Sequence, residues 1–362
     1  MTELRPIFGE RRFAVFRADA GPEIGGGHVM RCLTLAHALR AHGWACAFAV
    51  NRDALETVPA LAQSGFQIVV VRAREGGQTK AAKWLLAALD RPPALVVVDN
   101  YALDARYERV FQAQGAQVLA IDDLADRSHA CDILLDQTYG RDATAYALLV
   151  DAGAQVLLGP RYALLRPAFS RRREAALSAR AGRGGQLRRI LAAGGATDPG
   201  GIGLKALHAV ADPGLDVYLD IVVGAACPDL PALRRHADAR ADISLHVDID
   251  ADDYADLLAE ADLCIGAGGT SSWERCCLGV PTLAFVIAAN QSAIVDALAD
   301  VGAAIRVDVD ARQGPTLDQA LLALSGDRLR ILTMAEAAMN ICDGAGTARV
   351  AAELRVARDV KA

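Results

Sequence analysis

Short apolar runs recur along the chain, and helical patterns of apolar positions separate them. Runs such as LVVVD at 95–99 are apolar throughout, which is typical of strands covered by helices on both faces. After the first run, Val29, Cys32, Leu33 and Ala36 repeat at i, i+3, i+4 and i+7, which predicts a helix with one apolar stripe. The alternation predicts a parallel sheet. Its expected strands are 13–17, 45–50, 67–71, 95–99, 117–122, 133–136 and 155–158, and its expected helices are 29–42, 80–89 and 105–114.

The alternation stops near residue 161 and resumes near residue 190. Residues 161–189 are rich in Arg and Ala and include the run Arg171–Arg173. We interpret this stretch as a linker with one helix, whose arginines favour a solvated face over phosphate binding. The second alternation predicts strands at 190–193, 217–223, 244–247, 263–265, 282–285 and 304–307, with helices between them and then at 317–324, 328–340 and 347–358.

The pattern therefore predicts an α/β protein of two doubly wound domains. We place the first domain at 1–160, a linker at 161–187, the second domain at 188–340 and a C-terminal helix, which packs back on the first domain, at 341–362. Doubly wound domains bind ligands at the carboxyl ends of their strands. Two such domains facing each other would place the ligand in an interdomain crevice.

Composition and charge exclude several classes of protein. Among the 362 residues, 38 Lys and Arg against 44 Asp and Glu give a net charge of −6, which argues against a nucleic-acid or anionic-membrane binder. No apolar run reaches the length of a membrane span, and the first residues do not resemble a signal peptide. The eight cysteines form no CxxC pair and are interpreted as reduced, buried residues of a cytoplasmic protein.

A glycine-rich loop, GPEIGGGH at 21–28, follows the first expected strand and opens the first helix. Gly25, Gly26 and Gly27 would let a ligand approach the backbone closely. His28 then lies at the positive end of the helix dipole, which favours the neutral imidazole that a general base requires. Asp19, at the end of the preceding strand, would orient His28 or anchor substrate. The alternative is that the glycines only turn the chain and His28 only caps the helix.

A second loop, GAGGTSSWE at 266–274, has the composition of a diphosphate site. Backbone N–H groups from Gly268 onward and the hydroxyls of Thr270, Ser271 and Ser272 could hold phosphates without a metal. Glu274, one turn later, could accept both hydroxyl protons of a ribose diol. Alternatively, a hydroxyl only caps the helix and Glu274 only complements its dipole. We also expect ligand contacts from Gly269.

A third loop and several acids leave two interpretations open. Gly194 and Gly195 precede Asp198, so this turn either approaches phosphate or simply uses Asp198 as a helix N-cap. Asp99 and Asp123, at expected strand ends, either bind polar sugar groups or cap helices. A metal site is disfavoured because no His or Cys accompanies these acids at ligand spacing.

Together these segments resemble a known family, the UDP-2,4-diacetamido-2,4,6-trideoxy-β-L-altropyranose hydrolases of pseudaminic acid biosynthesis. The resemblance extends from about residue 17 to 291, and more distantly includes the cell-wall N-acetylglucosaminyltransferases that use UDP-GlcNAc. It rests on RADAGPEIGGGHVMRCLTLA, VVVDNYALDARYE, LAIDDLADRSHACDILLDQ, LLGPRYALLRPAF, AGGTSSWERCCLGVP and AANQ.

The resemblance implies a GT-B architecture, with UDP held by the second domain and the sugar facing the first. It implies that His28 is the essential histidine, that Tyr101 and Asn290 belong to the sugar site with Gln291 beside them, and that Glu274 binds ribose. It implies no cofactor and no metal. The expected reaction is hydrolysis of a UDP-sugar by water, with inversion at the anomeric carbon. The alternatives are a UDP-sugar-dependent glycosyltransferase and a non-catalytic nucleotide-sugar-binding protein.

Overall fold

The structure is a computed structural model that describes residues 12–21, 24–71, 76–211, 215–308 and 314–356. It divides into two compact units. Unit 1 takes residues up to 136, residues 141–158 and residues from 347 onward, and unit 2 takes residues 137–140 and 159–346. Each unit contains one parallel sheet with helices, as the hydrophobic pattern predicts.

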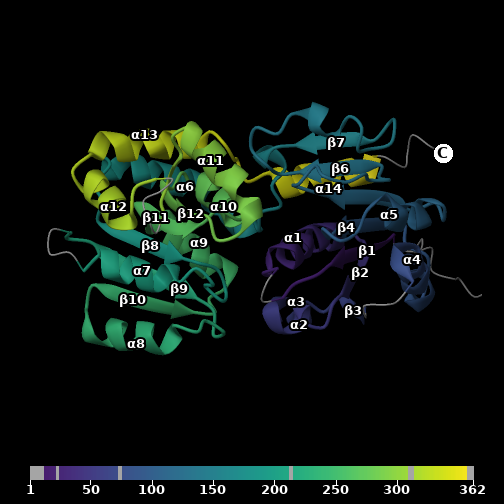
Figure 1. Ribbon diagram of the computed structural model, residues 1–362, viewed down its shortest axis with the longest axis horizontal. Coiled ribbons are helices and arrows are strands. Elements are labelled where there is room, and N and C mark those ends of the chain that lie inside the picture. Colours follow the sequence, from purple (N-terminus) through teal and green to yellow (C-terminus); the bar gives the residue numbers. More distant parts are fainter. Residues whose placement is uncertain (1–11, 22–23, 72–75, 212–214, 309–313, 357–362) are drawn as a thin grey trace, which may run out of the picture. The chain divides into compact units, whose positions relative to one another are not determined.

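The sheet of unit 1 has seven strands in the order β3-β2-β1-β4-β5-β6-β7 (Figure 1). The strands are β1 (Phe13–Ala18), β2 (Ala45–Val50), β3 (Gln67–Val70), β4 (Leu95–Asp99), β5 (Gln117–Ile121), β6 (Ile133–Asp136) and β7 (Gln155–Leu158). The chain runs outward from β1 to β3 and then crosses back to β4 on the other side of β1. The strand order therefore reverses between β1 and β4, which is where a doubly wound sheet opens a crevice at its carboxyl edge.

The helices of unit 1 follow its strands along the chain, except α14, which comes after unit 2. They are α1 (Gly27–Ala41), α2 (Ala54–Thr57), α3 (Pro59–Gln63), α4 (Gly77–Ala88), α5 (Ala105–Gln112) and α14 (Gly346–Val356), with a 3₁₀ turn η1 (Ala143–Tyr146). The apolar stripe predicted on α1 is buried. In α14, which includes most of the expected helix 347–358, Val350, Ala351 and Leu354 are buried and Glu353 accepts a hydrogen bond from Gln155 at 3.0 Å. Residues 357 and 358 of that expected helix lie outside the described residues.

The sheet of unit 2 has six strands in the order β10-β9-β8-β11-β12-β13. The strands are β8 (Arg189–Ala193), β9 (Tyr218–Val223), β10 (Ile243–Val247), β11 (Leu263–Ala267), β12 (Thr282–Phe285) and β13 (Ala304–Arg306). Here the order reverses between β8 and β11, so the loops after these two strands meet at the carboxyl edge. These are the loops that contain Gly194 and Gly268.

The helices of unit 2 surround this sheet and include the stretch interpreted as a linker. They are α6 (Pro167–Arg183), α7 (Ile202–Ala209), α8 (Leu230–Ala239), α9 (Ala251–Glu260), α10 (Ser271–Cys277), α11 (Ser292–Asp300), α12 (Leu317–Ser325) and α13 (Arg328–Met339), with 3₁₀ turns η2 (Pro160–Tyr162) and η3 (Ala289–Gln291). Within residues 161–187, α6 packs on α9 and buries Ala168, Phe169 and Ala176. The one helix expected in this stretch is therefore present as α6, and its residues belong to unit 2.

The arginine run of α6 makes specific contacts within unit 2. Arg171 and Arg172 form ion pairs with Asp252 of α9 at 2.8 and 2.6 Å. Arg173 donates to the backbone carbonyls of Met339 and Cys342 at 2.7 and 2.8 Å. These guanidinium groups therefore have partners within unit 2, which explains the arginine run without phosphate binding.

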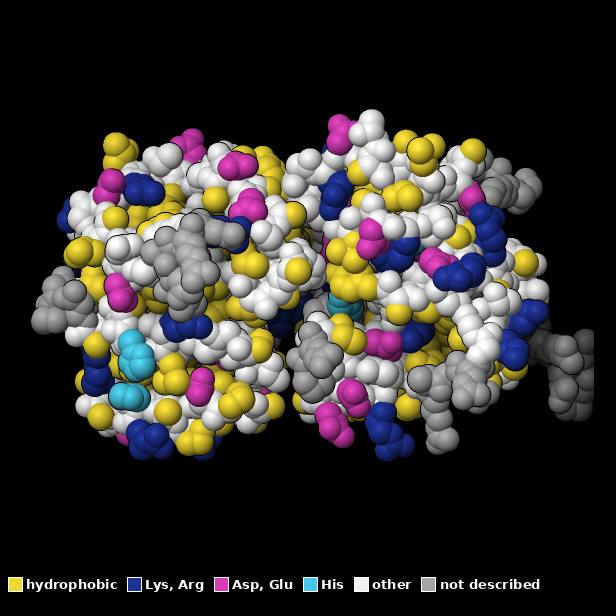
Figure 2. All heavy atoms as spheres, viewed as in Figure 1, with side chains coloured by type: hydrophobic (Ala, Val, Ile, Leu, Met, Phe, Trp, Pro, Cys, Tyr) yellow, Lys and Arg dark blue, Asp and Glu magenta, His cyan; other side chains and the backbone are white. Residues whose placement is uncertain are grey.

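The cysteines, the surface charges and the lengths of the helices can also be compared with what the sequence predicts. All eight cysteines are buried and unpaired, as predicted. On the face shown in Figure 2, basic and acidic side chains are interspersed over both units. In the part of the chain that the structure describes, no helix combines the length and apolarity that crossing a bilayer would require.

Candidate functional site

In unit 1 the glycine loop presents the start of α1. Gly25 donates to the carbonyl of Gly21 at 2.8 Å and has a positive φ of 74°, a backbone conformation that suits glycine. A Cβ on Gly26 would lie 2.9 Å from a methyl of Val58, so this position also excludes a side chain. Helix α1 begins at Gly27, and His28 is its second residue. Pro22 and Glu23 of this motif lie outside the described residues.

His28 forms a close pair with Asp99. Its Nδ1 lies 2.6 Å from Asp99 Oδ1, and the two side chains are 11% and 0% exposed. A carboxylate only accepts hydrogen bonds, so this contact requires the ring proton on Nδ1. In the neutral ring with its proton on Nδ1, the other nitrogen, Nε2, has a lone pair able to take a proton. The ring edge also packs against Tyr101, with 4.7 Å between ring centroids.

Asp99 is held as an anion by Arg31, a residue that was not expected from the sequence to belong to the site. Arg31 donates through Nε and Nη2 to the two Asp99 oxygens, both at 2.6 Å, and is 5% exposed. Burial opposes ionisation of Asp99, but the positive charge of Arg31 and the hydrogen bonds from Arg31 and His28 outweigh it and hold the pKa of this carboxyl well below its usual range. Asp99, expected from the sequence to contact substrate, is instead fully enclosed and orients His28.

Asp19 does not contact His28. Its carboxylate accepts hydrogen bonds from Arg17 at 2.7 Å, from Asn100 at 2.7 Å and from the backbone N–H of Asn51 at 2.8 Å. Burial raises the pKa of Asp19, but these partners together lower it. Asp19 therefore links the ends of β1, β2 and β4. The residue that contacts and orients His28 is instead Asp99, at the end of β4.

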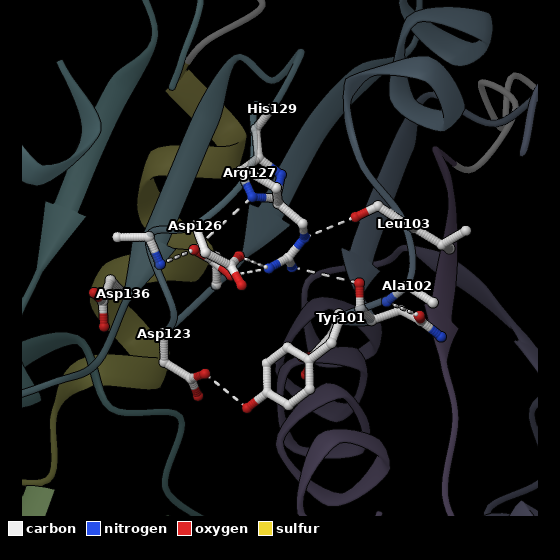
Figure 3. Close-up of polar contacts among 12 residues, drawn as sticks. Tyr101, Ala102, Leu103, Asp123, Asp126, Arg127, His129 and Asp136 are labelled. Carbon is white, nitrogen blue, oxygen red and sulfur yellow. Dashed lines mark hydrogen bonds and ion pairs between the residues drawn. The ribbon is translucent and has the colours of Figure 1, made fainter. Parts of the chain in front are cut away.

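Tyr101 and Asp123 are joined directly. The Tyr101 hydroxyl donates to Asp123 Oδ1 at 2.6 Å, and Figure 3 shows the ring pointing from the segment after β4 toward the loop after β5. Arg31 reaches the other oxygen of Asp123 at 3.3 Å. His28, Asp99, Tyr101 and Asp123, all expected as site residues, are thus brought together at the carboxyl edge of the sheet.

Behind Asp123 lies a buried network around Asp122 and Asp136. The Tyr146 hydroxyl lies 3.0 Å from an oxygen of each carboxylate. Arg127 pairs with Asp122 at 2.6 Å and Arg141 pairs with Asp136 at 2.7 Å. Figure 3 shows Arg127 also reaching carbonyls of the segment that contains Tyr101. The network fixes the loop that presents Asp123. Within the described ranges, no group of three or more His, Cys, Asp and Glu side chains is arranged to hold a metal ion.

Replacing Tyr146 with phenylalanine tests the weight of this network. The change leaves two buried carboxylates without a shared donor, so we expect the free energy of unfolding to fall by about 1–3 kcal/mol. A urea titration followed by tryptophan fluorescence measures this loss. Tyr101→Phe, which removes one bond to a partly exposed carboxylate, is the control and should cost less. An equal or smaller loss in Tyr146→Phe would contradict this account.

In unit 2 the GAGGTSS loop packs tightly against the turn that contains Gln291. A Cβ on Gly268 would lie 2.2 Å from a methyl of Val295 in α11, so a side chain cannot fit there. At Gly269 the nearest neighbour of an added Cβ would be the Gln291 amide nitrogen at 3.9 Å. Gln291 in turn accepts from the Ile287 N–H at 3.1 Å. The loop and Gln291 are therefore neighbours, as expected for residues of one site.

The hydroxyls of this loop differ in their availability. Ser272 is buried, and its Oγ accepts from Arg275 at 2.9 Å, so the ligand contact expected of Ser272 does not fit. Ser271 accepts from Arg275 at 3.1 Å. Thr270 lies at the N-cap position of α10 without a side-chain capping bond, so its hydroxyl is not used to cap the helix.

Glu274 is partly buried and already has a partner. Its Oε1 accepts from Arg166 Nη2 at 3.0 Å, and the two side chains are 14% and 26% exposed. A carboxylate can accept several hydrogen bonds, so this ion pair orients the group and leaves capacity for further donors. Arg166 lies in the motif LLGPRYALLRPAF but was not singled out from the sequence.

In the loop after β8, Asp198 caps a helix, which was one of the two roles considered for this turn. Asp198 accepts from the N–H groups of Ile202 and Gly203, both at 2.8 Å, and so caps the start of α7. The Asp198 carboxylate fills the space beside Gly194, where a Cβ would overlap it. Gly194 is thus explained by packing, whereas Gly195 has a positive φ of 94° and is exposed. Asn290 lies exposed in η3, next to Gln291.

Solved structures of other proteins are similar to this chain in fold. MurG from Acinetobacter baumannii has a TM-score of 0.66 at 19% identity, covering 95% of this chain and 99% of that one. CalG4, the calicheamicin glycosyltransferase, has a TM-score of 0.62 at 14% identity, covering 98% and 100%. The chain therefore has the GT-B fold, and the predicted pair of doubly wound domains is confirmed.

Two bacterial proteins are similar to this chain in sequence. Over 352 residues the chain is 27% identical to the spore coat polysaccharide biosynthesis protein SpsG of Bacillus subtilis (strain 168), covering 93% of this chain and 96% of SpsG. Over 161 residues it is 26% identical to the UDP-2,4-diacetamido-2,4,6-trideoxy-β-L-altropyranose hydrolase of Campylobacter jejuni subsp. jejuni serotype O:2, covering 43% of this chain and 52% of the hydrolase. No family model matches the chain.

Proposed function

We propose that this protein hydrolyses a UDP-linked 2,4-diacetamido-2,4,6-trideoxyhexose to UDP and the free sugar. The observation that carries the proposal is the His28–Asp99 pair, in which the carboxylate fixes the proton on Nδ1 and leaves Nε2 able to accept one. The similarity to a protein named as a hydrolase of such a substrate supports the choice of sugar and of water as the attacking group.

In this proposal unit 1 activates water. His28 Nε2 takes a proton from a water molecule as its oxygen attacks the anomeric carbon on the face opposite UDP. The C–O bond to UDP breaks, its electron pair leaves with the diphosphate, and the configuration at the anomeric carbon inverts. The imidazolium that forms is stabilised by the Asp99 carboxylate, 2.6 Å from Nδ1. Tyr101, held by Asp123, and Asn290 are proposed to contact the sugar.

Unit 2 is proposed to bind the nucleotide. The backbone of the Gly268–Gly269 turn, with Thr270 and Ser271, would bind the diphosphate, and Glu274 would accept protons from the ribose hydroxyls. UDP is a good leaving group once hydrogen-bond donors meet its growing charge, so this arrangement asks for no strong general acid.

The test is incubation of the full chain with a panel of UDP-diacetamido-sugars in the absence of any acceptor. We expect stoichiometric release of UDP and free sugar, with NMR showing the inverted anomer as the first product. Release of UDP only when an acceptor alcohol is added would instead establish a glycosyltransferase. Binding of the panel without UDP release under either condition would establish a non-catalytic binding protein.

A further inference from the structure

Arg31 lies at the centre of the charged groups around His28. It projects from α1 one turn after His28, so both side chains lie on the same face of the helix. Its guanidinium makes two 2.6 Å bonds to Asp99 and one 3.3 Å bond to Asp123, and its Nη2 lies 3.3 Å from His28 Nδ1. One buried cation therefore contacts both anions of the cluster and the imidazole.

The position of Arg31 opposes the effect of Asp99 on His28. A lone buried carboxylate at 2.6 Å would strongly favour the imidazolium and so leave little neutral ring to accept a proton. Arg31 compensates the charge of Asp99 while leaving its oxygen in place as the acceptor for Nδ1–H. The cation also disfavours a second positive charge 3.3 Å away.

We infer that Arg31 is a positioning residue that keeps the His28 ring neutral while Asp99 fixes its tautomer. A carboxylate beside a histidine both orients the ring and stabilises its charged form. Because Arg31 compensates the charge of Asp99, Asp99 keeps the first effect on His28 and largely loses the second. Asp123 weakens this effect of Arg31, because its carboxylate lies 3.3 Å from the guanidinium and compensates part of the positive charge. The expected effect on turnover rests on the proposed function, in which His28 is the base. The protonation state of the ring does not depend on that proposal.

The remaining surroundings of His28 are consistent with this balance. Among the described residues, the charged or titratable groups that reach the ring or its partners come from three segments: Arg31 and Cys32 on α1, Asp99 and Tyr101 at and after β4, and Asp123 and Arg127 after β5. Arg127 lies over the Tyr101 ring, 5.8 Å from its centroid, and its charge is paired with Asp122 at 2.6 Å. Burial raises the pKa of the Cys32 thiol, so this neighbour stays neutral. The decisive charges are therefore those of Arg31, Asp99 and Asp123.

The test is a pH titration of the full-length chain labelled with ¹⁵N-histidine, with His28→Gln assigning the His28 signals. In the wild type we expect the neutral ring to carry its proton on Nδ1. In Arg31→Gln we expect the pH at which half of the ring is protonated to rise by about one unit. Arg31→Lys, which retains the charge, should restore most of the wild-type behaviour. Asp123→Asn should move the titration the opposite way by a smaller amount.

The matched control is Arg189→Gln. Arg189 pairs with the buried Asp220 at 2.6 Å in unit 2, so this change also breaks an arginine–aspartate pair but should leave the His28 signals in place. No shift in a folded Arg31→Gln would overturn the inference. If that variant does not fold, a shift in Asp123→Asn toward higher pH, or a wild-type proton on Nε2, would overturn it as well.

Activity distinguishes this inference from the proposed function. If UDP-sugars are hydrolysed, the acid limb of the kcat/KM profile should move with the NMR titration in each variant, while the affinity for UDP stays constant. If the NMR shifts occur but no UDP-sugar is cleaved, the inference holds and the proposed function fails. If hydrolysis needs His28 but its pH profile is the same in Arg31→Gln as in the wild type, the proposed function holds and the inference about Arg31 fails.

Discussion

Replacing His28 with alanine is expected to lower kcat for UDP-sugar hydrolysis by about 10²–10⁴-fold, the range that loss of a positioned general base costs. The reason is specific to the geometry, because Nε2 is the ring atom that Asp99 leaves free to accept a proton. Affinity for UDP should stay within about twofold of the wild type, since the proposed nucleotide contacts lie on unit 2. Steady-state kinetics and calorimetry with UDP measure the two quantities.

His37→Ala is the matched control for this experiment. His37 lies on the same helix, is exposed and contacts Arg40 at 2.8 Å, so its loss should leave kcat unchanged. Asp99→Asn should lower kcat as well, because an amide in place of the carboxylate no longer fixes the proton on Nδ1. A His28→Ala enzyme that retains more than a third of the wild-type kcat would rule out the role of His28 as the base.

The strands of both sheets could be predicted from the sequence with little error. Each expected strand coincides with an observed one to within two residues at either end, including all seven strands of unit 1 and all six of unit 2. Parallel strands buried on both faces are continuous apolar runs, which few other structures produce. The helix expected within residues 161–187 is present as α6, and Ala168, Phe169 and Ala176 pack it into unit 2 against α9, a burial that its many arginines did not suggest.

The candidate site was only partly predictable. The loop glycines and His28 follow strands directly, so sequence order places them at the carboxyl edge of a sheet. Arg31 was missed, although a charged residue beside the apolar positions of α1 and one turn after His28 signals a buried partner. Asp99 and Asp19 both end neighbouring strands, and only the side-chain contacts show which one reaches the histidine.

Gly194 shows a different reason why sequence alone misleads. A glycine after a strand allows either a ligand or another part of the chain to approach the backbone. In this protein the approaching group is the Asp198 carboxylate, which caps α7. Gly268 is likewise explained by contact with Val295 of α11. A glycine-rich turn therefore predicts close approach but does not identify what approaches.

Replacing Glu274 with alanine is expected to weaken the binding of UDP by about 10–100-fold, which corresponds to losing hydrogen bonds to a charged group worth roughly 1.5–3 kcal/mol. The affinity for UDP alone is an incomplete measure, because the same change frees Arg166, whose charge then becomes available to the diphosphate. Comparing UDP with 2′-deoxy-UDP removes this ambiguity, since both ligands carry the same diphosphate.

Calorimetry should show that the wild type prefers UDP to 2′-deoxy-UDP and that Glu274→Ala abolishes the preference. Glu336→Ala, an exposed acid on α13 of the same unit, should retain both the affinity and the preference. A variant of Glu274 that still distinguishes the two nucleotides would show that another group recognises the ribose. In that case the role of the Glu274 carboxylate would be structural, namely the ion pair with Arg166 at 3.0 Å.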